Sequence, residues 1–86
     1  MKANFETLSV QVNFEGEPIV MDIRKQLGNL IRKSTSDIGF DEVARQIYFS
    51  SGDIDIPDEY IEPIKQLAAK NFIVPVQEAI NKMFNI

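Results

Sequence analysis

An alternation of apolar and polar residues within residues 5–14 constrains the fold of this chain more than any other feature. Four apolar side chains fall on one side of an extended chain: Leu8, Val10, Val12 and Phe14. A two-residue period of this kind is typical of a β-strand with one buried face. We therefore expect residues 5–14 to form a strand that packs on a hydrophobic core.

A second strand is expected directly after a tight turn at Glu15-Gly16. Glycine readily adopts the positive φ that such turns require, and Pro18 follows at a strand start, where a missing amide donor is tolerated. Residues 17–21 then return antiparallel to the first strand. The predicted opposing pairs are Val12 with Ile19, Val10 with Met21, and Leu8 with Ile23. A two-stranded hairpin is only marginally stable in water, so helices must cover it.

Helical periodicity replaces the alternation after residue 22. Four apolar residues recur at i, i+4, i+7 and i+8: Ile23, Leu27, Leu30 and Ile31. Such spacing indicates a helix with one apolar face, and this helix is the natural cover for the hairpin. Asp22 is expected to be its N-cap residue, because a carboxylate there can accept a bond from an unpaired first-turn amide.

A second helix is predicted over residues 40–49, with Ser36 or Asp41 as its N-cap residue. After it, residues 53–56 suit a short extended segment, which makes a third short strand an option. Asp58 can cap a third helix. Pro63 lies too far into that helix for an ideal first turn, so either the helix starts near Glu62 or a distorted turn precedes it.

The third helix is expected to end at Asn71 in a left-handed conformation, and Pro75 to begin a fourth helix. The apolar residue Ile86 suggests docking against the body or a partner. The predicted fold is α+β: a single small domain over residues 1–86, with an N-terminal antiparallel β-hairpin packed against three to four α-helices. The predicted core comprises Leu8, Val10, Val12, Leu27, Leu30, Ile31, Val43, Ile47, Leu67, Ile80 and Phe84.

The chain contains no cysteine and no histidine. A disulfide frame and a thiolate zinc site are therefore excluded, and the commonest general base is missing. No phosphate-loop glycine pattern or nucleophile motif occurs. An acidic group between Asp53 and Glu62 does not fit a calcium loop, because the sixth and twelfth positions hold Asp58 and Ile64 instead of Gly and Glu. We expect a protein that is not an enzyme, with no catalytic residue, no metal site and no cofactor.

Charge is distributed unevenly along the chain, whose net charge is -4. Residues 19–36 sum to +3, whereas residues 37–62 sum to -7. The polar face of the first helix carries five candidate partner-binding residues, and an aromatic anchor at the end of the second helix completes the set. The candidates are Arg24, Lys25, Asn29, Arg32, Lys33 and Tyr48. Gly28 lies among them and would permit a close approach.

These features lead to two functional hypotheses. The first is a non-catalytic protein-interaction or small regulatory module that self-associates as a homo-oligomer or binds an acidic protein partner. The alternative is a nucleic-acid-binding protein that uses the basic face of the first helix. A helix-turn-helix version of the alternative is disfavoured, because Asp41 and Glu42 would meet the duplex. No apolar run approaches the roughly 20 residues that span a bilayer, so no membrane partner is expected.

Two segments, GEPIVMDIRKQLGN at residues 16–29 and SDIGFDEVARQIYFSSG at residues 36–52, resemble segments of short uncharacterised proteins from bacterial prophages and other mobile elements. The resemblance covers the first 50 residues or so of the chain. It implies a bacterial, cytoplasmic setting and assigns no site residues.

Overall fold

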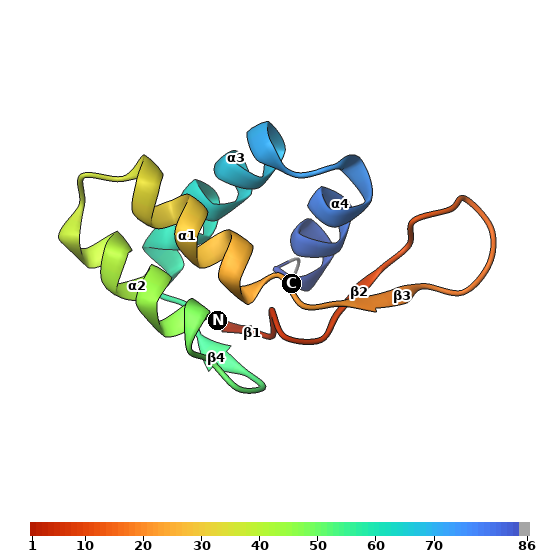
Figure 1. The fold of residues 1–86 in the computed structure, drawn as a ribbon, viewed down its shortest axis with the longest axis horizontal. Coiled ribbons are helices and arrows are strands. Elements are labelled where there is room, and N and C mark those ends of the chain that lie inside the picture. The colour runs from red at the N-terminus through yellow and green to blue at the C-terminus, as the bar shows by residue number, and fades with distance from the viewer. Residues whose placement is uncertain (85–86) are drawn as a thin grey trace.

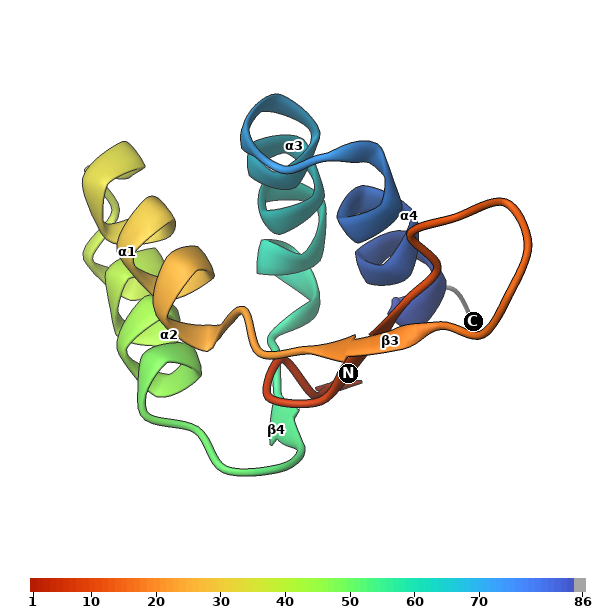
Figure 2. The same cartoon turned by 45° about the vertical axis from the view of Figure 1, so that its right-hand side comes forward.

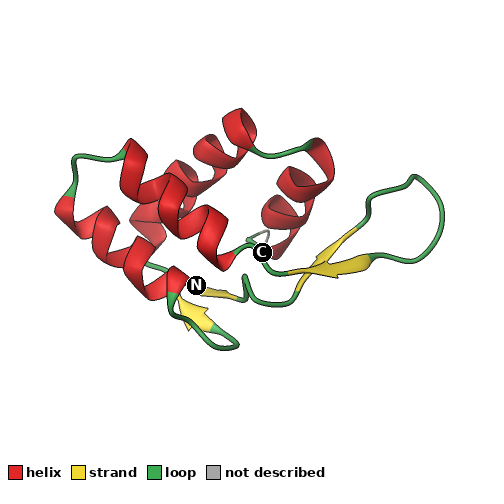
Figure 3. Cartoon of the chain, viewed as in Figure 1, coloured by secondary structure: helices red, strands yellow, loops and turns green. Residues whose placement is uncertain are grey.

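Two short antiparallel strand pairs and four helices make up the described residues, 1–84, of the computed structural model (Figures 1 and 3). In chain order the elements are β1 (Lys2–Ala3), β2 (Leu8–Val10), β3 (Ile19–Met21), α1 (Arg24–Ser34), α2 (Ile38–Tyr48), β4 (Ile54–Asp55), the 3-10 turn η1 (Asp58–Tyr60), α3 (Ile61–Asn71) and α4 (Val74–Met83). The predicted α+β fold, with its N-terminal antiparallel hairpin and helices, is confirmed.

The hairpin pairs β2 with β3, but its register differs from the predicted one by two residues. Leu8 lies opposite Met21, and Val10 lies opposite Ile19. The ladder stops at Val10 because the side-chain amide of Gln11 donates to the carbonyl oxygens of Asn13 and Gly16, at 3.0 and 2.8 Å, which closes a wide loop in place of a two-residue turn. Gly16 does adopt the expected positive φ, 103°.

A register change of two residues keeps every side chain on its expected face, because strand side chains alternate with a period of two. Leu8 and Val10 are therefore buried as predicted. The shorter ladder leaves the rest of the alternating run in a loop, residues 11–18, that extends beyond the helices (Figure 1). Val12 is 44% exposed and Phe14 is fully exposed, so the predicted burial of both residues is wrong.

Helix α1 begins at Arg24 with Ile23 as its N-cap residue, so the predicted N-cap residue, Asp22, lies one residue too early. The Asp22 carboxylate still accepts a bond from a first-turn amide, that of Arg24, at 3.1 Å. The buried face of α1 is formed by Leu27, Gly28 and Ile31, whereas Leu30 is only half-buried. Because α1 packs mainly on α2, the prediction that it covers the hairpin is wrong: α4 covers β2 (Figure 2).

Helix α2 starts two residues before the predicted boundary. Its N-cap residue is Asp37, whose carboxylate accepts a bond from the Gly39 amide at 2.8 Å, so neither Ser36 nor Asp41 has that role. The ring of Tyr60 stacks on Phe40 at 5.0 Å and thereby joins η1 to α2. This stacking contact fixes the start of α2 against the turn that precedes α3.

The short strand β4 pairs with β1 rather than with the hairpin. The turn η1 precedes α3, and Pro63 lies in the first turn of α3. This agrees with the second of the two predicted alternatives, a distorted turn before the helix. Asn71 stays helical, and its side-chain amide donates to the Leu67 carbonyl oxygen at 2.9 Å, so the predicted left-handed cap is wrong. Pro75 lies in the first turn of α4, as expected.

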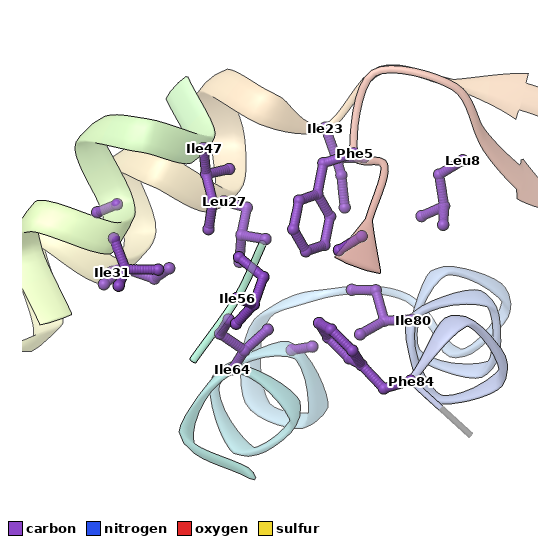
Figure 4. Close-up of a cluster of buried hydrophobic side chains, with 14 of the residues drawn as sticks. Phe5, Leu8, Ile23, Leu27, Ile31, Ile47, Ile56, Ile64, Ile80 and Phe84 are labelled. Atoms are coloured by element: carbon purple, nitrogen blue, oxygen red, sulfur yellow. The ribbon is translucent and has the colours of Figure 1, made fainter. Parts of the chain in front are cut away.

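The core lies where the strands meet the inner faces of the helices (Figure 4). Most of the predicted core residues are buried there; Leu30 and Leu67 are half-buried, and Val12 is exposed. Phe5, which the core prediction omitted, is fully buried with its ring edge-on to Phe84 at 6.1 Å. The prediction for Ile86 falls outside the described residues. Among residues 1–84, no helix has the length and apolarity that crossing a membrane requires.

Candidate functional site

A groove between α1 and α2 collects three of the six predicted partner-binding residues. It encloses about 250 Å³ and is lined in part by Asn29 and Arg32 from α1 and by Tyr48 at the end of α2. Arg45 and Phe49, which the sequence did not single out for this site, complete its α2 wall. Arg24, Lys25 and Lys33 do not line this groove.

Gly28 forms the floor of this groove and brings the two helices close together. A Cβ at residue 28 would lie 3.0 Å from both the Ala44 carbonyl oxygen and the Tyr48 Cβ. Glycine inside a helix costs about 1 kcal/mol relative to alanine, so its presence needs a packing reason. The close approach that Gly28 permits is that of α2, because the residue is buried and faces this helix.

Arg24 is held by its own chain. Its guanidinium contacts the Asp22 carboxylate at 2.8 Å and the Glu6 carboxylate at 3.3 Å, and it also donates to the Ser50 carbonyl oxygen. The hydrogen bonds that Arg24 donates lower the pKa of Asp22, and the same pairing raises the pKa of Arg24. With its side chain only 22% exposed, Arg24 connects the hairpin to the end of α2.

The remaining basic residues of α1 differ in their surroundings. Arg32 forms an ion pair with Asp41 of α2 at 2.9 Å, which partly neutralises the groove. Lys25 and Lys33 are exposed and form no ion pair within residues 1–84. Exposed lysines of this kind are typical of a solvated helix face. The predicted basic face is thus divided between internal pairs and two exposed lysines.

The two aromatic residues at the end of α2 differ in their exposure. Tyr48 is half-buried against α1, whereas Phe49 is 74% exposed. Their rings meet edge-on at 4.8 Å. Phe49 is therefore the more exposed of the two aromatic side chains that line this groove.

The Arg24 pairing predicts a measurable dependence of stability on pH. Because the pKa of Asp22 is lower in the folded chain than its ordinary 3.8, the pairing stabilises the fold fully above that pH. The contribution is lost as the pH falls through the folded pKa. Asp22→Asn should therefore flatten the fall of the urea midpoint between about pH 5 and pH 2. Asp53→Asn, which removes the same charge from an exposed position, should keep the wild-type slope.

A second surface, which we call the hairpin ribbon, comprises residues 11–21. Residues 11–20 are all exposed, and four of them are large and apolar: Val12, Phe14, Ile19 and Val20. The sequence predicts Val12 in the core and Phe14 on the buried face of the same strand, and it does not single out Val20. Their exposure depends on where the helices end relative to the strands, which the alternation alone does not encode.

The two edges of the hairpin formed by β2 and β3 are not equivalent. Strand β2 lies beside α4, and a cavity of about 200 Å³ between them is lined by Ser9 of β2 and by Ala79 and Lys82 of α4. Strand β3 pairs with β2 on one side only. Within residues 1–84, the outer edge of β3 therefore leaves backbone amide and carbonyl groups without a ladder partner.

Within the described part of the chain, no group of three or more carboxylate, histidine or cysteine side chains is arranged to hold a metal ion.

Burial and the neighbouring Asp37 raise the pKa of Tyr60, whose hydroxyl donates to the Asp37 carboxylate at 3.4 Å. Because Tyr60 stacks on Phe40 and helps to hold η1, this shift has a structural cause.

Comparison with protein-family models, curated proteins and solved structures gave no match for this chain.

Proposed function

We propose that this chain is a non-catalytic protein-interaction module that self-associates through the hairpin ribbon. The observation that carries the proposal is the complete exposure of Phe14, together with Val12, Ile19 and Val20, on one projecting element. Scattered exposed apolar residues need no explanation, but several on one element mark an interaction surface. Phenylalanine is also enriched at interface centres.

The instability of an isolated two-stranded ribbon supports the proposal. Such a hairpin is marginal in water unless a further strand or a helix covers it. Helix α4 covers β2, but the loop and β3 extend past it (Figures 1 and 2). A second copy would supply the missing cover, and a domain of this size gains much from a shared interface because its own core is small.

A regulatory or scaffolding role follows more naturally from this surface than catalysis does. The perturbed groups in the described residues are Asp22, Arg24 and Tyr60, and each perturbation arises from a structural contact. None lies at a cavity with a nucleophile and a base. In keeping with the resemblance to prophage and mobile-element proteins, we place the module in a bacterial cytoplasm.

Sedimentation velocity over a range of concentrations tests the proposal. The wild-type chain should sediment faster as its concentration rises. Phe14→Ser should raise the dissociation constant of the self-association at least tenfold. Phe49→Ser is the matched control, since it removes the other strongly exposed aromatic side chain from a different surface. If Phe49→Ser, but not Phe14→Ser, weakens association, the groove between α1 and α2 is the contact surface instead of the ribbon.

The alternative function, nucleic-acid binding through α1, depends on fewer free cations than the sequence suggested. Arg24 and the exposed Arg32 both pair with carboxylates, which leaves Lys25 and Lys33 as the cations of α1 that form no ion pair within residues 1–84. Because phosphate binding strengthens with each neutralised charge, two lysines would give weak binding with a shallow salt dependence. An acidic protein segment at the groove would meet the same limited positive charge.

A further inference from the structure

Among residues 1–84 the outer edge of β3 is open, and its protection is limited to its shortness, three residues, and to Pro18 just before it. Residues 19–21, Ile-Val-Met, contain no charge and no proline. Natural edge strands commonly carry lysine, proline or a bulge that prevents pairing with another chain. On β2, by contrast, Lys82 of α4 lies beside the strand at Ser9. The two edges of this hairpin thus differ in how well they are protected.

From this asymmetry we propose that β3 pairs antiparallel with β3 of a second copy about a twofold axis at Val20, forming a continuous sheet of strands β2, β3, β3 and β2. This inference rests on the proposed self-association and specifies its geometry. An isologous contact requires a self-complementary surface, in which each residue pair occurs twice or lies on the axis. Antiparallel pairing of identical strands meets this requirement.

The side chains of β3 match under this symmetry. Val20, 68% exposed, would face Val20 of the second copy, and Ile19 would face Met21 twice. Strand alternation puts Val20 on the outer face with Ser9, while Ile19 and Met21 share the inner face with Leu8 and Val10. Each new contact is therefore apolar on both faces of the sheet, and cross-strand apolar pairs stabilise a ladder.

The residues that flank β3 limit this pairing to three residues in each copy. Pro18 has no amide donor and would lie opposite Asp22 of the second copy, where the ladder must end. The Asp22 charge does not oppose the contact, because Arg24 in the same chain holds this carboxylate at 2.8 Å. The twofold axis also keeps the two Asp22 residues at opposite ends of the pairing.

Cysteine crosslinking tests the register directly, because the chain has no cysteine of its own. Directly opposed residues on antiparallel strands have Cα atoms about 4.5–5.5 Å apart, within the span of a disulfide. Val20→Cys should therefore form a linked dimer under oxidised glutathione at concentrations where the wild-type chain associates. Ser9→Cys is the control on the same face, since its two copies would be roughly 14 Å apart across three strand spacings.

A charge substitution gives a second, non-covalent test. Val20→Lys places two ammonium groups at the twofold axis and should reduce association at least tenfold, whereas Ser9→Lys should reduce it less than threefold. Association that persists in Val20→Lys, or crosslinking through Ser9→Cys but not Val20→Cys, overturns the β3 pairing and leaves self-association standing. A wild-type chain that stays monomeric overturns both.

Discussion

Phe5→Ala is expected to lower the free energy of unfolding by about 3–5 kcal/mol, the range for removing a buried phenylalanine. Phe5 is fully buried, and its ring meets Phe84 of the C-terminal region edge-on at 6.1 Å. Its carbonyl oxygen also accepts a bond from the Ile23 amide at 2.9 Å. Phe5 therefore joins the segment before β2 to the start of α1 and to the residue after α4.

Urea denaturation monitored by circular dichroism measures this effect. A chain of this length is stabilised by about 4–13 kcal/mol in total, so the variant should lose roughly a quarter or more of its stability and unfold at a clearly lower urea concentration. Phe49→Ala, the same substitution at a 74% exposed position, should cost less than about 1.5 kcal/mol, the upper value for losing one edge-on aromatic pair. Equal losses in the two variants would show that Phe5 is not in the core.

Gly28→Val is expected to lower the free energy of unfolding by about 1–3 kcal/mol, the usual cost of adding atoms to a packed interface. Even a Cβ at this position would lie 3.0 Å from the Ala44 carbonyl oxygen, a backbone atom that moves only if α2 moves. On helix propensity alone, replacing glycine should be neutral or favourable. The sign of the change therefore distinguishes packing from propensity.

Gln26→Val is the control for this substitution. Gln26 lies two residues earlier in α1, is exposed and does not line the groove between α1 and α2, so valine there changes helix propensity without entering that contact. Its unfolding free energy should stay within about 0.5 kcal/mol of wild type. A Gly28→Val variant as stable as wild type would contradict the close packing of the two helices.

The hairpin shows how far local patterns predict this fold. Alternation correctly assigned Leu8 and Val10 to the buried face, because that face depends only on residue parity. The register depended on Gln11, whose side chain closes the wide loop, and alternation carries no information about that bond. The prediction that Val12 is buried was wrong for a related reason. A side chain is buried only where another element packs on it, and the helices do not extend over Val12 in space.

The helices were easier to predict than their partners. Periodicity identified α1 and α4, and the apolar faces of these helices are largely those observed. It could not show that α1 packs on α2 through Gly28, because a residue without a side chain adds nothing to an apolar stripe. The sequence showed which residues form the basic face of α1 but not which of them are paired. Arg24 pairs with Glu6 and Arg32 with Asp41, and these partners are too far apart in the sequence for the pairing to be predicted.

The most direct test of self-association through the hairpin ribbon is sedimentation equilibrium of the unaltered chain across a wide range of concentrations. The expected result is a mass that rises from that of one 86-residue chain towards twice that value and does not exceed it. A twofold contact closes at two copies, so a plateau at the dimer agrees with β3 pairing. The mass of a single chain at every concentration would contradict the proposed function.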